Sequence, residues 1–240
     1  MEQNYRHCKI VIATRKYWRE IVDQLAGMGF GSDSIVNMGH EQEMLAESIY
    51  FDLPYLKNTG AEVFVDGGCY DGQTIDGFVK WAGGKYKKIF AFEPDSNNVG
   101  KCEAFIRRNR LEHVEVCNCA LTDKSKELRF NAEGSALSGA DENGSTIVRG
   151  GSLQKYVGEE HVSFIKLDIE GMELEALRGM EQIIKKDKPK MAVSVYHKEQ
   201  DIWEIPLLLL EFNPDYRFYL RHYSLGLVDT VLYAVDPLQK

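Results

Sequence analysis

The chain has 240 residues, of which 29 are Lys or Arg and 37 are Asp or Glu, so its formal net charge is −8 with histidine neutral. A chain of this length builds one large domain, or one domain with a small appendage, and needs no disulfides or structural metal to fold. Apolar residues at 44% and charged residues at 28% exclude a disordered chain, a collagen and a coiled coil. The acidic balance argues against nucleic acid as the main partner, because phosphate backbones are bound by clustered lysine and arginine.

Hydropathy and cysteine content bear on the compartment. The longest apolar stretch, residues 205–210, contains a proline and is far shorter than the roughly 20 residues of a membrane span. The first residues lack the apolar core of a signal peptide, so we expect a cytoplasmic protein without a membrane span. The cysteines, at positions 8, 69, 102, 117 and 119, are odd in number and lack a framework spacing, which predicts reduced thiols.

The N-terminal part of the chain has a pattern of its own. Residues 9–14 and 34–38 are short apolar runs typical of strands, and residues 17–28 have apolar positions at helical spacing. Residues 41–56 are expected to form a second helix, closed by the turn sequence Asn58-Thr59-Gly60. We therefore expect a small α/β extension over residues 1–60, with a role in packing or dimer contact, and a main domain over residues 61–240.

From residue 61 onward strands and helices alternate, which is typical of an α/β fold with a mainly parallel sheet covered by helices. Strands are expected over residues 62–66, 88–92, 114–118, 128–130, 164–168 and 189–196, with a final pair over 217–222 and 230–235. Helices are expected over residues 73–81, 95–109, 173–186 and 202–212, the last tolerating Pro206 only in its first turn. Residues 132–151 are rich in Gly, Ser, Asn and Asp and predict a long loop.

The strongest motif is a strand that runs into Asp66 and then into the turn Gly67-Gly68-Cys69-Tyr70-Asp71-Gly72, which opens a helix. In open α/β sheets the ligand crevice lies at the carboxyl ends of the strands, and glycines let the backbone approach a cofactor. A dinucleotide fingerprint is the main alternative, but Cys69 takes the place of its middle glycine and would crowd a pyrophosphate. Asp66 also places a negative charge there, so the turn favours a cationic cofactor such as S-adenosylmethionine.

Polar and small residues follow the next two strand ends. Glu93 comes about 20 residues after the glycine turn, where a carboxylate can hold ribose hydroxyls, and Pro94 sets the exit direction of the chain. Small residues at the end of the third strand leave room for an adenine ring. Asn118 either hydrogen-bonds the cofactor or caps the turn, and the sequence does not choose between these roles.

A last polar group follows two further strands of the parallel sheet. Asp168 and Glu170 face the same crevice, although Glu170 or Glu173 could instead stabilise a helix N-terminus. His197 follows another strand end, and histidine is the residue most often tuned to remove a hydroxyl proton. Asp168, Glu170 and His197 are also suitable ligands for a divalent cation, although the sequence alone does not predict a metal.

Together these motifs resemble the FkbM-type methyltransferases, a branch of the class I S-adenosylmethionine-dependent enzymes. The resemblance covers residues 61–236 and rests on VFVDGGCYDGQT, AFEPD, NCAL, IKLDIEGMELEALRG and the tail from SVYHKEQDIWEIP to DTVLYAV. It implies a Rossmann-like, mostly parallel sheet of seven strands whose last strand inserts antiparallel. It also implies methylation of oxygen, often on sugars or natural-product hydroxyls.

The resemblance assigns residues to parts of the cofactor. It implies that the glycine turn lies near the methionine part, that Glu93 holds the ribose, and that residues 118–121 lie near the adenine. The set expected at the cofactor is Asp66, Gly67, Gly68, Cys69, Tyr70, Asp71, Thr74, Glu93, Pro94, Asp95, Asn118, Ala120, Leu121, Asp168 and Glu170. The segment 134–144, with Ser135 and Ser138, lies where such enzymes could cover the cofactor.

We therefore expect an enzyme that methylates a hydroxyl of a saccharide or a natural-product-like small molecule. His197 is expected to take the hydroxyl proton, assisted by Asp168, and Arg221 and His222 are further candidates for substrate binding. Two other hypotheses stay open, an NAD-type oxidoreductase and a non-catalytic module that binds the cofactor within an assembly. A homodimer is possible, and no nucleic acid partner is expected.

Overall fold

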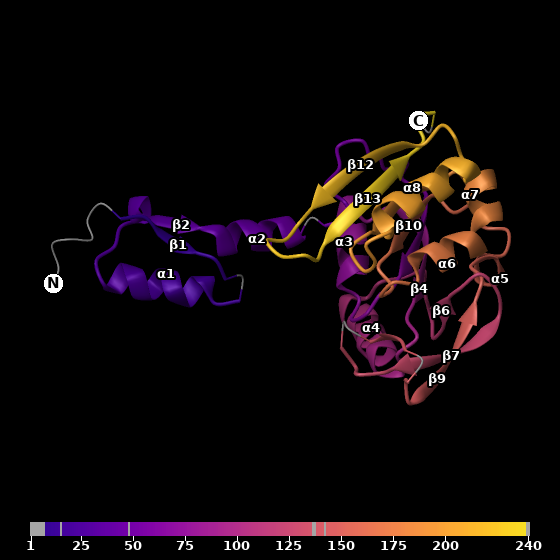
Figure 1. Ribbon diagram of the computed structural model, residues 1–240, viewed down its shortest axis with the longest axis horizontal. Helices are drawn as coiled ribbons and strands as arrows, with labels where there is room; N and C mark the ends of the chain where they lie inside the picture. The colour runs from indigo at the N-terminus through magenta and orange to yellow at the C-terminus, as the bar shows by residue number, and fades with distance from the viewer. Residues whose placement is uncertain (1–7, 15, 48, 136–137, 142, 239–240) are drawn as a thin grey trace. The chain divides into compact units, whose positions relative to one another are not determined.

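The computed structural model describes residues 8–238 except 15, 48, 136–137 and 142 (Figure 1). It divides into two compact units, residues 1–49 with 223–227 and residues 50–222 with 228–240. The segment 50–60, which we expected in the N-terminal extension, therefore groups with the larger unit. No helix within the described ranges is long and apolar enough to cross a membrane.

The smaller unit has the expected order of strand, helix, strand and helix. β1 (Ile10–Ile12) pairs in parallel with β2 (Ile35–Asn37), and α1 (Trp18–Gly27) and a short 3-10 helix (Ser32–Ser34) connect them. α2 (Met38–Glu47) ends well before residue 56, where we expected it to end. The reason is local: Tyr50 has a φ of 75°, and Pro54 disfavours helix at its own position and the one before it.

The main sheet of the larger unit has seven strands in the order β12-β13-β11-β10-β3-β4-β5. β13 is antiparallel to both of its neighbours, and the other pairs are parallel, which confirms the predicted class I architecture. The strands are β3 (Glu62–Gly67), β4 (Tyr86–Phe92), β5 (Val114–Cys117), β10 (Phe164–Leu167), β11 (Lys190–Ser194), β12 (Arg217–His222) and β13 (Thr230–Val235).

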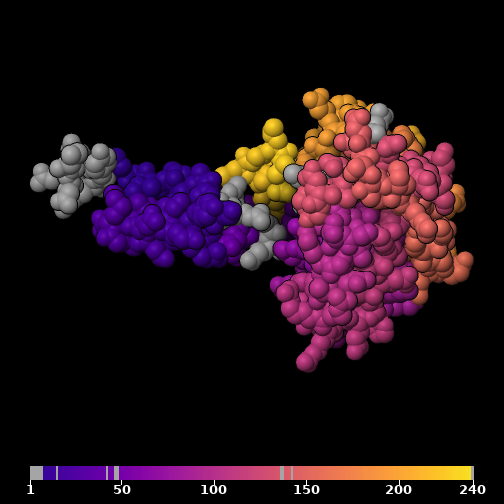
Figure 2. Space-filling view, turned by 90° about the horizontal axis from the view of Figure 1, so that it is seen from below, coloured from indigo at the N-terminus to yellow at the C-terminus, as the bar shows by residue number. Residues whose placement is uncertain are grey.

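A second sheet of four strands was not expected. Its order is β6-β9-β7-β8, with β6 (Ala120–Leu121), β7 (Lys126–Asn131), β8 (Gly139–Ala140) and β9 (Thr146–Gly151). The predicted loop over residues 132–151 was therefore wrong where β8 and β9 pair antiparallel with β7. The local content of Gly, Ser and Asn disfavours strands, but pairing with β7 outweighs this low intrinsic strand propensity. Figure 2 shows that the segment from α4 (Ser96–Asn109) to β9, coloured magenta to salmon, forms much of one face of the larger unit.

Six helices cover the main sheet: α3 (Gln73–Trp81), α4 (Ser96–Asn109), α5 (Gln154–Val157), α6 (Glu173–Gly179), α7 (Glu181–Asp187) and α8 (Asp201–Phe212). We expected α6 and α7 to be one helix, but the chain breaks at Met180. A Cβ at Gly179 would lie 2.2 Å from the carbonyl oxygen of Thr122, so this glycine allows close packing there. Pro206 lies one turn further inside α8 than we expected.

Side chains alternate between the two buried faces of the main sheet. On one face, Phe64 of β3 stacks on Phe78 of α3 with ring centroids 4.2 Å apart, and Phe164 of β10 meets both rings edge-on. The other face carries aliphatic residues that pack against α6, α7 and α8. Asp66 and Lys166 follow Phe64 and Phe164 by two residues, so both lie on the aromatic face at the carboxyl end of the sheet.

Candidate functional site

The turn after β3 is held by the protein's own backbone. The N–H groups of Gly68 and Cys69 both donate to the carbonyl of Phe92, at 2.9 and 3.1 Å. Gly68 has a φ of +78°, and a Cβ at this position would lie 1.9 Å from the carbonyl oxygen of Asp168. Gly68 is therefore required by the close approach of the turn to the end of β10, whether or not a cofactor is bound.

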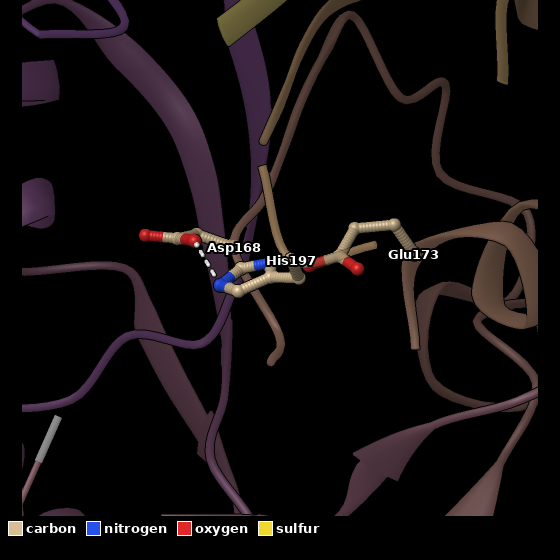
Figure 3. A group of neighbouring side chains, drawn as sticks. All are labelled: Asp168, Glu173 and His197. Atoms are coloured by element: carbon tan, nitrogen blue, oxygen red, sulfur yellow. Dashed lines mark ion pairs between the residues drawn. The ribbon is translucent and has the colours of Figure 1, made fainter. Parts of the chain in front are cut away.

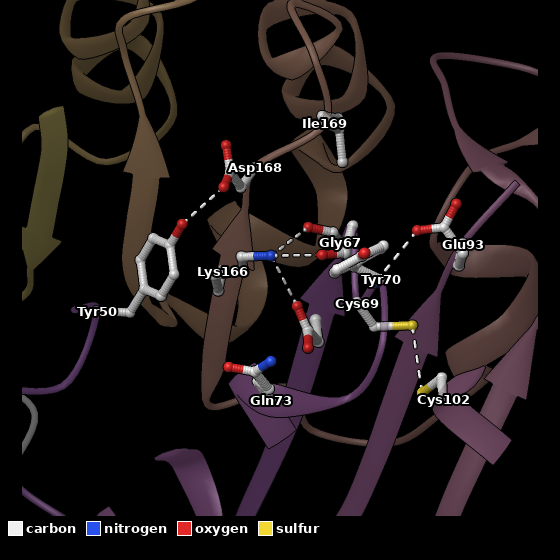
Figure 4. A network of polar contacts seen from close by, with 12 residues as sticks. Tyr50, Gly67, Cys69, Tyr70, Gln73, Glu93, Cys102, Lys166, Asp168 and Ile169 are labelled. Atoms are coloured by element: carbon white, nitrogen blue, oxygen red, sulfur yellow. Dashed lines mark hydrogen bonds and ion pairs between the residues drawn. The ribbon is translucent and has the colours of Figure 1, made fainter. Parts of the chain in front are cut away.

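A buried lysine lies under this turn (Figure 4). Nζ of Lys166 lies 3.0 Å from Oδ1 of Asp66 and donates to the carbonyls of Gly67 and Gly68 at 3.0 and 2.7 Å. Lys166 and Asp66 are register partners on β10 and β3, and both side chains are buried. Lys166 was not among the expected site residues, although a lysine within the apolar run FIKLD was a usable signal, since a buried charge needs a partner.

This ion pair changes the charge of the site. Burial raises the pKa of Asp66. Burial also opposes the charge on Lys166, but the carboxylates of Asp66 and Asp168 outweigh it and raise the pKa of Lys166. The negative charge at Asp66, which we took as favouring a cationic cofactor, is therefore compensated inside the protein.

The side chain of Cys69 belongs to the packing between the turn and α4. Its Sγ lies 3.6 Å from Sγ of Cys102, and both thiols are buried and free (Figure 4). The expectation that Cys69 would crowd a pyrophosphate was therefore wrong. The choice between S-adenosylmethionine and a dinucleotide has to be made on other evidence.

Glu93 connects the ends of β3 and β4. Its Oε2 accepts a hydrogen bond from the N–H of Tyr70 at 3.2 Å, and its Oε1 accepts one from the N–H of Asp95 at 2.9 Å. Asn118 donates to the carbonyls of Glu93 and Pro94 at 3.0 and 2.9 Å, so in this structure it caps the turn. Burial raises the pKa of Glu93. Each of its oxygens keeps a lone pair, which suits it to ribose hydroxyls.

The carboxylate of Asp95 is used by the fold. One oxygen caps α4 by accepting from the N–H of Asn97 at 2.9 Å, and the other accepts from the N–H of Gly134 and the hydroxyl of Ser138, both at 2.8 Å. Burial opposes ionisation, but these hydrogen bonds lower the pKa of Asp95. The described part of the segment 134–144 is thereby anchored to the start of α4, and cofactor covering by this segment stays a prediction.

Asp168 lies at the end of β10 and accepts two tyrosine hydroxyls. Tyr50 donates to Oδ2 at 2.7 Å, and Tyr196 donates to Oδ1 at 3.1 Å. Tyr50 is buried, and Nζ of Lys166 lies 5.3 Å from the centroid of its ring (Figure 4). Tyr50 was not among the expected site residues, because no local pattern links residue 50 to a strand end more than a hundred positions later.

His197, which follows β11, lies between three carboxylates. Its Nε2 is 3.5 Å from Oδ1 of Asp168, and its Nδ1 is 2.9 Å from Oε1 of Glu173 (Figure 3). The same Nε2 is 3.6 Å from Oε1 of Glu170. Burial lowers the pKa of His197, but these carboxylates outweigh it and raise the pKa to about 10. His197 is therefore an imidazolium at neutral pH, which holds a proton and does not accept one.

Four other expected cofactor residues are placed by the start of α3 and by the second sheet. Asp71 accepts from the N–H of Gln73, the first residue of α3, at 3.2 Å, and Thr74 lies on the same helix. Ala120 and Leu121 are buried in β6. Their contact with an adenine ring stays a prediction.

The two polar residues expected from β12 have partners of their own. Arg221 forms an ion pair with Asp52 at 3.4 Å, and Nδ1 of His222 lies 2.9 Å from Oγ1 of Thr230. Both side chains are exposed. Neither of these contacts joins them to the Asp168 cluster, so their role in substrate binding stays a prediction.

Comparison with known families decides the class of protein. The model for the methyltransferase FkbM domain matches residues 66–224. The chain belongs to this FkbM methyltransferase family. No curated protein matches the sequence.

Two solved structures place the FkbM chain among its relatives. The methyltransferase FkbM from Methylobacillus flagellatus has a TM-score of 0.69 and 26% identity, over 82% of this chain and 51% of that chain. The chain therefore spans about half the length of that relative. Aeropyrum pernix fibrillarin, solved with bound S-adenosyl-L-methionine, has a TM-score of 0.52 and 14% identity over 80% and 74% of the two chains, and it shares the fold.

The charge of His197 leads to a pH dependence of the stability of this FkbM protein. Its pKa is raised from 6.5 to about 10, so its contribution is fully present below pH 6.5 and is lost as the pH rises through about 10. We expect the free energy of unfolding to fall across this range more steeply in the wild type than in His197→Gln. Urea unfolding at several pH values measures both slopes. Equal slopes in the wild type and His197→Gln would contradict the assignment.

Proposed function

We propose that the protein transfers a methyl group from S-adenosylmethionine to a hydroxyl of a saccharide or another small molecule. The observation that carries this proposal is the position of Asp168, an ionised carboxylate at the end of β10, beside the glycine turn of β3. Membership of the FkbM methyltransferase family supports methyl transfer over the oxidoreductase alternative. Fibrillarin, which shares the fold, binds S-adenosylmethionine, and this supports the choice of cofactor.

The residues at the ends of β3 and β4 suit this cofactor. Glu93 presents a buried carboxylate whose position is set by the N–H groups of Tyr70 and Asp95, so it is preorganised to accept from ribose hydroxyls. The turn at Gly68 leaves no side chain on the side that meets the end of β10. S-adenosylmethionine would supply a methyl group bound to a positively charged sulfur.

Asp168 is the group we assign to the acceptor hydroxyl. Burial opposes its ionisation, but Lys166, Tyr50 and His197 outweigh burial and lower the pKa of Asp168. An ionised carboxylate accepts a hydrogen bond from the hydroxyl and takes its proton as the oxygen is alkylated, when that proton becomes strongly acidic. His197, as an imidazolium, holds the carboxylate in place. We thus assign the proton acceptor to Asp168 and the assisting role to His197, the reverse of the roles that we expected from the sequence. Most of the rate would come from holding the two reactants in line.

The net charge of the protein and its membership of the FkbM family both bear on the class of acceptor. A net charge of −8 does not favour a polyanionic partner, so we propose a small neutral acceptor. We assign packing or a homodimer contact to the N-terminal extension.

Cofactor binding is tested by calorimetry with S-adenosylhomocysteine and with NAD. We expect binding of the former only, weakened by roughly 10- to 100-fold in Glu93→Gln, because a hydrogen bond to a charged group is lost. The matched control is Glu103→Gln on α4, where Glu103 forms an exposed ion pair with Arg107. Tight binding of NAD without S-adenosylhomocysteine would overturn the proposed cofactor.

The reaction is tested by transfer of labelled methyl groups to a panel of sugars and small hydroxyl compounds. We expect Asp168→Asn to lower kcat by about 100-fold or more, as is typical of a lost proton acceptor. Tyr50→Phe keeps the carboxylate and removes one hydrogen bond, so we expect a loss of about tenfold. Asp123→Asn, on the exposed turn after β6, leaves the rate unchanged. Cofactor binding without transfer to any acceptor would favour the non-catalytic module.

A further inference from the structure

The side chains around His197 have the arrangement of a metal centre. We propose that Asp168, Glu170 and Nε2 of His197 bind one divalent transition-metal ion, Mn²⁺ or Zn²⁺, while Glu173 orients the imidazole. Carboxylates and imidazole are the ligands that these ions prefer. Binding of the ion does not depend on the proposed function, although its use in methyl transfer would.

The distances fit shared coordination. Asp168, Glu173 and His197 form a group whose potential ligand atoms lie within 4.8 Å of one another (Figure 3), and Glu170 faces the same imidazole from its Nε2 side. Nε2 of His197 lies 3.5 Å from an oxygen of Asp168 and 3.6 Å from one of Glu170. Two ligand atoms bonded to one ion at about 2.1 Å are roughly 3.0–3.4 Å apart, which is only slightly less than the two distances measured from Nε2 of His197.

The second nitrogen of the ring faces a carboxylate, the kind of group that usually orients a metal-bound histidine. Nδ1 of His197 lies 2.9 Å from Oε1 of Glu173, whose side chain has no exposed surface. The same oxygen accepts from the N–H of Ile169 at 2.8 Å, so its position is set by the backbone. A carboxylate on the far nitrogen sets the ring orientation and makes the near nitrogen a better ligand.

An independent observation is the lack of hydrogen-bond partners for buried atoms of this cluster. The side chain of His197 is only 8% exposed, and its ring nitrogens face the carboxylates of Asp168, Glu170 and Glu173, yet neither nitrogen has a hydrogen-bond partner of good geometry. Oε2 of Glu173 and Oδ2 of Asp201 are likewise buried without a hydrogen bond. Buried polar atoms are rarely left in this state, and a cation that binds the cluster would compensate them.

The charge of the cluster favours a cation as well. Asp168, Glu170, Glu173 and Asp201 are carboxylates, and Nζ of Lys198 is directed to the carbonyl of Gly171. Lys166 lies on the other side of Asp168 and forms an ion pair with Asp66. The carboxylates near His197 therefore outnumber the cations that face them.

Binding of the ion to His197 requires the release of one proton. The ion takes the lone pair of Nε2, and the proton that this nitrogen carries is released to water. The metal-bound form therefore replaces the imidazolium form of His197, and Asp168 is then a ligand of the ion and not the proton acceptor. An acceptor hydroxyl beside the ion would lose its proton to water more readily, because the ion would lower the pKa of that hydroxyl.

Metal binding is tested on the full chain without cofactor or acceptor. Metal-free protein is titrated with Mn²⁺, free Mn²⁺ is followed by electron paramagnetic resonance, and Zn²⁺ is then added as a competitor. We expect one equivalent of bound Mn²⁺, displaced by Zn²⁺. Absence of both ions after dialysis and elemental analysis would overturn the proposal. Because the measurement uses neither cofactor nor methyl transfer, its failure leaves the proposed function intact, and failure of methyl transfer leaves this test intact.

Variants locate the ion. We expect His197→Ala and Glu170→Gln to weaken Mn²⁺ binding at least tenfold, and Glu173→Gln to weaken it about 10- to 100-fold, as is typical of a residue that orients a ligand. Glu170 is partly exposed, so Glu170→Gln tests the site even where replacement of the buried Glu173 impairs folding. His161→Ala and Glu181→Gln replace exposed side chains, are the matched controls and keep wild-type affinity. Equal affinity in His197→Ala and the wild type would place the ion elsewhere and overturn the proposal.

Discussion

The candidate site depends on one buried ammonium group. Lys166 holds the carboxylate of Asp66 and the carbonyls of Gly67 and Gly68 at the same time, so a single side chain joins two adjacent strands and the turn between strand and helix. Removing one partner of such a buried pair typically costs about 3–5 kcal/mol, because the other charge is left without compensation. The conformation of the turn is therefore tied to the burial of Lys166, before any cofactor is considered.

The same ammonium group shapes the neighbouring reaction site. Its charge lowers the pKa of Asp168. The ionised carboxylate of Asp168 and the side chains of Glu170 and Glu173 in turn raise the pKa of His197. The site thus has two parts with different electrostatics. The turn of β3 is internally neutral, whereas the ends of β10 and β11 carry excess carboxylates around one imidazolium. The first part suits a ligand held by shape and hydrogen bonds, and the second suits a hydroxyl or a cation.

Apolar runs and family motifs predicted the strands that short stretches of sequence determine. The apolar runs ending at Asp66 and Asp168 identified β3 and β10, and the family motifs implied the antiparallel β13. The strand β9 was missed because it is stabilised by pairing with β7, and a short window of sequence does not show which segments pair. Tyr50 was missed for the same reason. The charge of His197 depends on three carboxylates that the fold brings together, so its role could not be read from a histidine at a strand end.

Hydrogen exchange at the glycine turn tests most directly whether Lys166 holds it. Mass spectrometry would follow the peptide that covers residues 66–73 in the wild type and in Lys166→Met, with β12 as an internal reference for global folding. Loss of the ammonium group removes the hydrogen bonds to Gly67 and Gly68 and leaves Asp66 uncompensated. We expect exchange in this peptide to accelerate at least tenfold while exchange in β12 is unchanged. Unchanged exchange in residues 66–73 would contradict the account.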